Sequence, residues 1–183
     1  MCEVIFVMWK IKSQQTRLSS RIRNELCRID FRCVIAGAVI ILLCGLLSAL
    51  AAGSPGAYYE LEKPKGSPPA LLFPIVWSVL YALIGGAAGA VACQKDRSLE
   101  SEKYKGLLFF IVQMIFNFIW APLFFGAGAY FAAFAAIIMM IILSICTAVC
   151  FFRVLKLAGT AMVIYLLWLL FAAYLNLGIL ILN

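Results

Sequence analysis

The sequence contains no histidine among its 183 residues. Histidine is the usual side chain for acid–base catalysis near neutral pH and the commonest protein ligand for metal ions. Its absence excludes a serine–histidine catalytic triad, a haem iron held by histidine, and the paired-histidine zinc sites of metalloproteases. Any chemistry in this chain must therefore come from other side chains or from a reactive ligand.

The cysteines offer no metal site by their spacing. None belongs to a C-x-x-C pair, and their odd number argues against a closed set of disulfides. We expect most of them to be small apolar residues within helices, and we predict no bound metal. The seven are Cys2, Cys27, Cys33, Cys44, Cys93, Cys146 and Cys150.

Charged residues are scarce inside the long apolar stretches of the chain. Apolar residues make up 66% of the sequence, against roughly 45–50% in a soluble domain. A helix needs about 20 apolar residues to cross a membrane, and five stretches satisfy this: 33–53, 70–93, 106–125, 129–152 and 157–182. The predicted fold class is an all-α integral membrane protein with a five-transmembrane-helix bundle. These spans leave no room for a soluble catalytic domain.

Residues 1–32 precede the first span and form a basic extension. Leu18, Ile22, Leu26 and Ile29 follow helical spacing and would give an apolar stripe. The extension is predicted to be an amphipathic helix on the membrane surface or a disordered tail. A mitochondrial targeting segment is a third reading, which the three acidic residues of the extension weaken. Residues 33–183 form the predicted membrane domain.

Lysine and arginine are distributed unequally between the loops, and this predicts the orientation. Seven lie in the N-terminal segment, four in loop 94–105 and two in loop 153–156, against two in loop 54–69. The first three segments should face the positive-inside compartment, and loop 54–69 and the C-terminus the other side. The membrane would be the cell membrane in a prokaryote, and a mitochondrial or other organelle membrane in a eukaryote. The net charge of +7 then indicates contact with lipid headgroups, not with nucleic acid.

Polar and aromatic residues recur on one face of three spans. Lipid offers such groups no hydrogen-bonding partner, so we expect them to point inward. They would surround a pocket with flat aromatic walls, although tryptophan and tyrosine at membrane interfaces and amides that join helices are the simpler alternative. The residues are Phe73, Trp77 and Tyr81; Gln113, Asn117, Trp120 and Phe124; and Tyr165, Trp168, Ala172 and Asn176.

The 54–69 loop is longer than a helix–helix connection needs, and loops of this kind are usually functional. Pro64, Pro68 and Pro69 restrict its backbone, and Gly66 supplies a bend. We predict that it closes the pocket as a lid, with an ordinary surface loop as the alternative.

Small residues recur at four-residue spacing in the second span, at Ala82, Gly86 and Ala90, with Gly85 and Gly89 beside them. Such stripes let helices approach closely. The pattern leaves open whether the partner helix belongs to the same chain or to a second copy. Between the third and fourth spans, Gly126-Ala127-Gly128 predicts a tight antiparallel hairpin.

Four ordered motifs carry a resemblance to a known family. They are YxxLxKPxxxPP from Tyr58 to Pro69, FPxxWxxLYxLxG from Phe73 to Gly85, NFIWAPLFFG from Asn117 to Gly126, and YLLWLLFAAYLN from Tyr165 to Asn176. Together they resemble the TspO/MBR family, which includes the translocator protein and the tryptophan-rich sensory proteins. The resemblance covers roughly residues 35–183.

The resemblance implies a five-helix bundle, often a homodimer, whose pocket is capped by the first loop. It implies tetrapyrrole ligands, protoporphyrin IX or haem, together with other apolar molecules, and no required cofactor. The ligand-binding positions carried over by motif are Tyr58, Pro68, Trp77, Asn117, Trp120, Phe124, Trp168 and Ala172.

Three functions are compatible with this resemblance. The first is a membrane-embedded sensor that binds tetrapyrroles and regulates porphyrin metabolism or a stress response. The second is a light- and oxygen-dependent enzyme that degrades porphyrin, with Trp77 and Trp168 as the reactive side chains. The third is a passive carrier for tetrapyrroles or sterols. Energised transport is the weakest form of this reading, because the sequence offers no charged intramembrane relay or inverted repeat.

Overall fold

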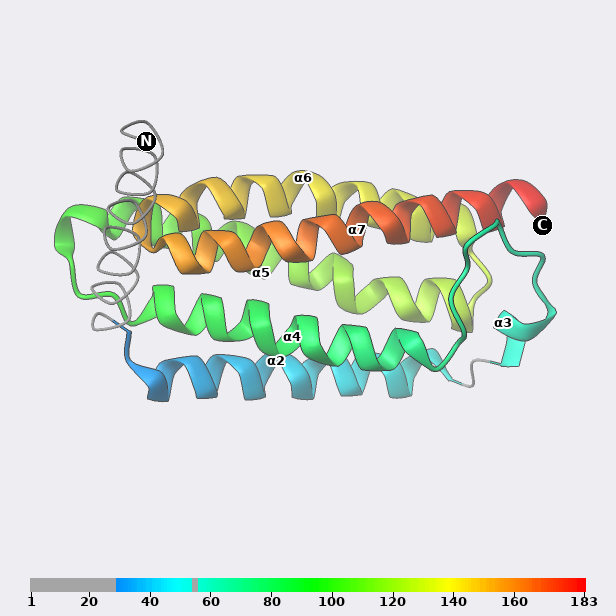
Figure 1. The fold of residues 1–183 in the computed structure, drawn as a ribbon, viewed down its shortest axis with the longest axis horizontal. Helices are drawn as coiled ribbons and strands as arrows, with labels where there is room; N and C mark the ends of the chain where they lie inside the picture. Colours follow the sequence, from blue (N-terminus) through cyan, green and yellow to red (C-terminus); the bar gives the residue numbers. More distant parts are fainter. Residues whose placement is uncertain (1–28, 54–55) are drawn as a thin grey trace, which may run out of the picture.

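The computed structural model describes residues 29–53 and 56–183, and all the regular structure in these residues is helical. Five long helices run side by side in Figure 1, and each is long and apolar enough to cross a membrane. They are α2 (Phe31–Ala52), α4 (Leu72–Ala92), α5 (Glu100–Ala121), α6 (Tyr130–Val154) and α7 (Lys156–Leu182). The predicted five-span membrane bundle is therefore confirmed. The prediction for the N-terminal extension falls almost entirely outside the described residues.

The helix bounds agree with the predicted spans within two residues for α2, α4, α6 and α7. The predicted third span, 106–125, differs from α5 by more than that at both ends: α5 ends at Ala121, and the distorted segment described below continues to Gly126. That helix begins at Glu100, directly after the short 3₁₀ helix η1 (Arg97–Leu99), whereas the predicted span began at residue 106. Glu100 and Glu102 lie in its first turn, where negative side chains stabilise the positive end of a helix. Hydropathy finds only the apolar part of a helix, so a charged first turn outside the membrane is missed.

The end of α5 widens into a π-helical segment, η2 (Pro122–Gly126). The amide of Ala127 donates to the carbonyl of Pro122 over 2.9 Å, five residues back instead of four. Proline has no amide hydrogen and crowds the preceding turn, which commonly distorts a helix at that point. Gly128, at φ +61°, then reverses the chain and α6 begins at Tyr130. The predicted glycine hairpin between the third and fourth spans is confirmed.

The five helices surround a shared interior. α6 lies between α5 and α7, while α4 packs on α2 and α7 and also meets α5. Figure 1 shows α3 (Gly56–Glu60) and the segment after it at the end of the bundle where the chain finishes. Much of the apolar surface of α2 remains exposed, including Leu43, Leu47 and Leu50. In a membrane these side chains meet lipid.

The small-residue stripe of α4 is used within the chain, against α2. A Cβ atom added to Gly37 would lie 2.3 Å from the carbonyl oxygen of Gly85, and one added to Gly89 would lie 2.0 Å from that of Cys33. Side chains cannot occupy such distances, so backbone meets backbone along this seam. We call the contact of Gly37 with Gly85 and Gly89 the glycine seam.

A disulfide joins Cys33, near the start of α2, to Cys93, just after α4. These two residues are exceptions to the expectation that most of the cysteines are ordinary apolar helix positions. Their Cα atoms are 6.4 Å apart although 60 residues separate them in sequence. Only the close approach of α2 and α4 brings them together, which spacing along the chain does not reveal. Among the described cysteines, Cys44, Cys146 and Cys150 are free thiols.

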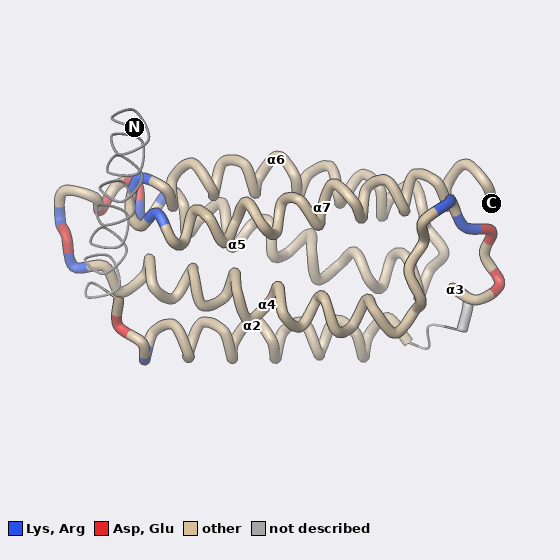
Figure 2. Tube along the Cα trace, viewed as in Figure 1, with Lys and Arg blue, Asp and Glu red and all other residues tan. Residues whose placement is uncertain are grey.

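Charged residues gather at the two ends of the bundle, as Figure 2 shows for the described residues. One end, the basic end, carries Arg32, Lys95, Arg97, Lys103, Lys105, Arg153 and Lys156, together with the acidic residues Asp30, Asp96, Glu100 and Glu102. The other, the lid end, carries Lys63 and Lys65 with Glu60 and Glu62. The unequal charge of the two faces fits the predicted relative topology, and the compartment that each faces stays a prediction.

Candidate functional site: an aromatic pocket beneath a lid

Residues 56–69 cross the lid end of the bundle, and we call them the lid. Its short helix α3 places Tyr58 inward, where only 4% of the residue is exposed. The Tyr58 hydroxyl donates to the carbonyl of Pro68 over 3.2 Å, which joins the two ends of the lid. Burial raises the pKa of the Tyr58 phenol above its ordinary value.

The lid bends back at Gly66, whose φ of +84° is a conformation that glycine adopts without strain. Beside it, the amide and hydroxyl of Ser67 both donate to the carbonyl of Pro64, over 3.3 and 2.8 Å. The predicted roles of the prolines and of Gly66 in shaping this loop agree with this turn.

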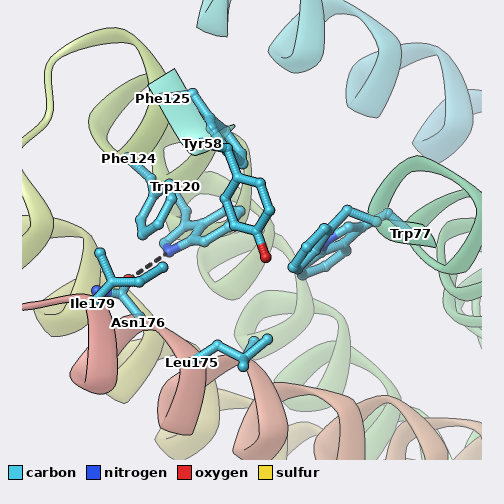
Figure 3. A pocket seen from close by; sticks show the side chains of 10 residues that line it. Tyr58, Trp77, Trp120, Phe124, Phe125, Leu175, Asn176 and Ile179 are labelled. Atoms are coloured by element: carbon cyan, nitrogen blue, oxygen red, sulfur yellow. Dashed lines mark hydrogen bonds between the residues drawn. The ribbon is translucent and has the colours of Figure 1, made fainter. Parts of the chain in front are cut away.

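Beneath Tyr58 lies a pocket whose walls are mostly aromatic rings (Figure 3). Trp120 stacks on Phe124 with ring centroids 5.2 Å apart, and Trp77 faces Trp120 at 6.1 Å. Aromatic pairs prefer such offset and edge-to-face arrangements, which fix the planes of the rings. The lining residues are Tyr58, Phe73, Trp77, Trp120, Phe124, Phe125, Ala172, Leu175, Asn176 and Ile179.

Five of the eight predicted ligand-binding residues line this pocket: Tyr58, Trp77, Trp120, Phe124 and Ala172. The other three lie just outside it. Pro68 lies in the lid, where its carbonyl accepts a hydrogen bond from Tyr58. Asn117 lies below the aromatic rings and Trp168 beside them.

Asn117 lies one turn deeper than Trp120 on α5 and is almost fully buried. Its side-chain oxygen accepts from the Tyr81 hydroxyl over 2.5 Å, and its amide donates to the Tyr165 hydroxyl over 2.6 Å. The amide thereby joins α4, α5 and α7 below the pocket. Both polar atoms of the Asn117 side chain have protein partners, and the residue lies in the layer below the pocket.

Trp168 stands beside the pocket on α7. Its ring meets Trp77 edge to face at 6.5 Å and Phe73 at 6.4 Å. Its indole nitrogen is buried and has no hydrogen-bonding partner. A buried donor without a partner is uncommon and calls for an explanation.

Trp120, in contrast, has its indole nitrogen satisfied. It donates to the side-chain oxygen of Asn176 over 3.1 Å, drawn as the dashed line in Figure 3, and Asn176 donates in turn to the Tyr130 carbonyl over 3.0 Å. This relay from α5 through α7 to α6 fixes the plane of the Trp120 ring.

The free space between the lining side chains is about 10 Å³. A single water needs roughly 10–15 Å³ measured in this way. The rings and Tyr58 therefore fill the pocket, and a ligand of any size must displace some of them.

No group of three or more Cys, Asp or Glu side chains is close enough to hold a metal ion in the part of the chain that the structure describes. The site is apolar and aromatic, with Asn176 and Trp168 as its polar neighbours.

Comparison with known proteins decides the family. The TspO/MBR family model matches residues 36–182, most of the chain and all five spans. The chain belongs to the TspO/MBR family.

Similar TspO/MBR proteins come from distant organisms. Protein CrtK of Rhodobacter capsulatus is 35% identical over 149 residues, which cover 80% of this chain and 91% of that protein. Tryptophan-rich protein TspO of Chlorobaculum tepidum is 34% identical, over 82% of this chain and 97% of that protein. The human translocator protein is 31% identical over 65% of this chain and 70% of its own length.

Sequence reasoning left five lining residues out of the predicted TspO/MBR site. Phe73 and Asn176 appear on the inward faces by spacing, but the family motifs did not single them out as ligand contacts. Phe125 follows Phe124 directly, and regular helical spacing turns neighbours about 100° apart; both reach the pocket from the π-helical segment η2. Leu175 and Ile179 are aliphatic residues in an apolar span, so their residue type does not distinguish them from lipid-facing positions. Ile179 does continue the helical spacing of Ala172 and Asn176, and this signal could have identified it.

Proposed function

We propose that this TspO/MBR protein is a membrane receptor that binds planar tetrapyrroles, such as protoporphyrin IX or haem, beneath the lid, and reports them to porphyrin metabolism or a stress response. The observation that carries the proposal is the aromatic pocket. Trp77, Trp120 and Phe124 offer flat apolar surfaces from two different helices, which is the kind of wall that a large conjugated ring recognises.

The polar groups near the pocket support the same ligand class. The unpaired indole nitrogen of Trp168 can donate to a ligand oxygen, such as a propionate carboxylate. Lys63 lies over the Tyr58 ring, 4.9 Å from its centroid, and places a positive charge in the lid. An acidic, flat and otherwise apolar molecule would satisfy both features.

The test is a titration of the purified protein with protoporphyrin IX in the dark, followed by quenching of tryptophan fluorescence. We expect saturable binding that weakens when Trp77 and Trp168 are both changed to Phe. The matched control is Trp9→Phe, which lies in the N-terminal extension outside the family match. Quenching that does not saturate, or that is equal in all variants, would contradict tetrapyrrole binding.

A second function is favoured by the placement of the three pocket tryptophans. The Trp77 ring lies 6.1 Å from Trp120 and 6.5 Å from Trp168, so an electron can pass between indoles in contact. A porphyrin excited by light would take an electron from an indole and pass it to oxygen, which becomes superoxide. The tryptophan radical cation would then recover an electron from the porphyrin, and the porphyrin radical cation would combine with superoxide to give an oxygenated product. Under illumination in air, this candidate predicts that the porphyrin absorption bands disappear with the wild-type protein. They should persist with the Trp77→Phe/Trp168→Phe double variant. A stable spectrum in the wild-type protein would exclude it and leave the receptor.

A further inference from the structure

The lid must move for any ligand to reach the pocket. Tyr58 packs edge-on against Phe73 at 5.4 Å and against Phe125 at 6.4 Å, so its ring occupies the mouth. With about 10 Å³ free beneath it, no planar ligand fits while Tyr58 stays in place. What holds the lid down therefore decides access.

The far end of α7 holds the lid through a two-point contact with its backbone. The Asn183 side-chain oxygen accepts from the amide of Glu62 over 3.1 Å, and the Asn183 side-chain nitrogen donates to the carbonyl of Glu62 over 3.0 Å. A primary amide thus pairs with both polar groups of one residue in the lid. This contact is independent of the side chain at position 62.

Two further contacts lie within the last turns of α7. The Tyr174 hydroxyl donates to the carbonyl of Lys65 over 2.9 Å. Pro64 lies directly on Gly178, where an added Cβ would come within 2.5 Å of the proline Cγ. Gly178 is therefore the place on α7 where the lid seats, and no other residue type would allow the same approach.

The pocket and the lid are contacted by different residues at this end of α7. Tyr174 and Gly178 share one face of the helix, and Asn183 directly follows its last residue, Leu182. Ala172, Leu175, Asn176 and Ile179 line the pocket, whereas Tyr174, Gly178 and Asn183 touch the lid. The lid-facing hydrogen bonds are exposed to solvent, so each is weak and water can replace it when the lid leaves. Exposed, short-range contacts of this kind suit an element that opens and closes.

We propose that Tyr174, Gly178 and Asn183 form a latch that holds the lid closed, and that release of this latch is the step that admits and frees ligand. The inference rests on the proposed function for the identity of the ligand. The latch itself is a property of the protein without ligand, and it can be measured without one.

The experiment compares wild-type protein in lipid nanodiscs with Asn183→Ala and Gly178→Ala. The first loses both hydrogen bonds to Glu62, and the second forces Pro64 away from α7. Ile181→Ala is the matched control, because this residue lies in the same helix turns and is 73% exposed. Hydrogen exchange of the lid amides is measured without ligand. Dark association and dissociation of protoporphyrin IX are then followed by stopped-flow quenching of tryptophan fluorescence.

We expect Asn183→Ala to speed exchange over the whole of residues 58–67 by about two- to tenfold, the range for loss of one or two weak hydrogen bonds. Gly178→Ala should speed exchange over the same residues, because the added methyl group forces Pro64 off α7. Association and dissociation of protoporphyrin IX should accelerate by similar factors, with little change in Kd, because the latch holds the lid in both states. Ile181→Ala should match the wild type.

Two results would overturn the latch. One is faster exchange confined to the Glu62 amide, which would mean that Asn183 caps a local turn only. The other is unchanged ligand kinetics in variants whose lid exchanges faster. If wild-type protein does not bind protoporphyrin IX, the proposed ligand is wrong, and exchange over the lid still decides the latch by itself.

Discussion

Toward the basic end, α2 and α4 touch through glycines, whereas at the lid end α4, α5 and α7 touch through aromatic rings. In the glycine seam, backbone meets backbone, and the Cys33–Cys93 disulfide ties the same two helices beside it. Such a contact has no side chain to rotate, so the helices keep one spacing. Around the pocket, ring planes meet at angles from 24° to 89°. These contacts are made by side chains and by the lid, so displacement of Tyr58 would open this end, whereas the glycine seam has no side chain to displace.

The largest effect should come from a change in the glycine seam. Gly89→Leu would place a side chain where the Cys33 carbonyl lies, 2.0 Å from the new Cβ. Since overpacking alone commonly costs about 1–3 kcal/mol and here the obstacle is backbone, we expect a loss above about 3 kcal/mol, or no folded protein. The measurement is the thermal melting of the detergent-solubilised protein. The control is Val79→Leu, at an exposed position of the same helix, which should melt like the wild type. Equal melting temperatures of the two variants would contradict close backbone packing in the glycine seam.

The disulfide should have the next largest effect. Changing Cys33 and Cys93 to Ser opens a link across 60 residues, and such a link typically contributes about 2–4 kcal/mol. A non-reducing digest of the wild-type protein should contain one peptide pair joined through these two residues. Cys44→Ser, at a free thiol, serves as the control for melting. Recovery of Cys33 and Cys93 in separate peptides before reduction would show that the bond does not form.

A smaller loss of stability is expected at Asn117, in the layer below the pocket. Asn117→Ala leaves the buried hydroxyls of Tyr81 and Tyr165 without their shared partner, at a cost of about 2 kcal/mol. Tyr165→Phe leaves one buried donor, the Asn117 amide nitrogen, without its acceptor, so its cost should be lower than that of Asn117→Ala, which affects two hydroxyls. Melting temperatures of the two variants test the order, and a Tyr165→Phe variant that melts below Asn117→Ala would contradict it.

The smallest predicted effect distinguishes two tryptophans of the pocket region. Trp120→Phe loses the bond to Asn176 and should cost about 1 kcal/mol beyond the change in ring size. Trp168→Phe loses no hydrogen bond, because that indole nitrogen is unpaired. Each variant is thus the control for the other, and equal destabilisation in thermal melts would mean that the Trp120–Asn176 bond adds nothing.

The amino-acid sequence predicted the membrane bundle because lipid imposes a severe constraint on composition. A span must be about 20 residues long and nearly free of charge, and this is visible without any tertiary information. The inward faces at Trp77, Asn117, Trp120 and Phe124 followed for the same reason, since polar and aromatic groups recur there at helical spacing. The four motifs then predicted the family, and the family model confirmed it.

Other features depended on contacts between residues far apart in the chain. Cys33 and Cys93 form a bond only because the glycine seam brings α2 and α4 together, and the small-residue stripe did not say which helix it meets. Phe125 joins the pocket because Pro122 widens the end of α5 into a π-helical segment. Asn183 reaches Glu62 across 121 residues. Residue types and their periodicity decided which surfaces face lipid and which face inward, because these depend on one helix at a time. The tertiary structure alone decided which inward surfaces meet, because that depends on distances between helices that no spacing along the chain encodes.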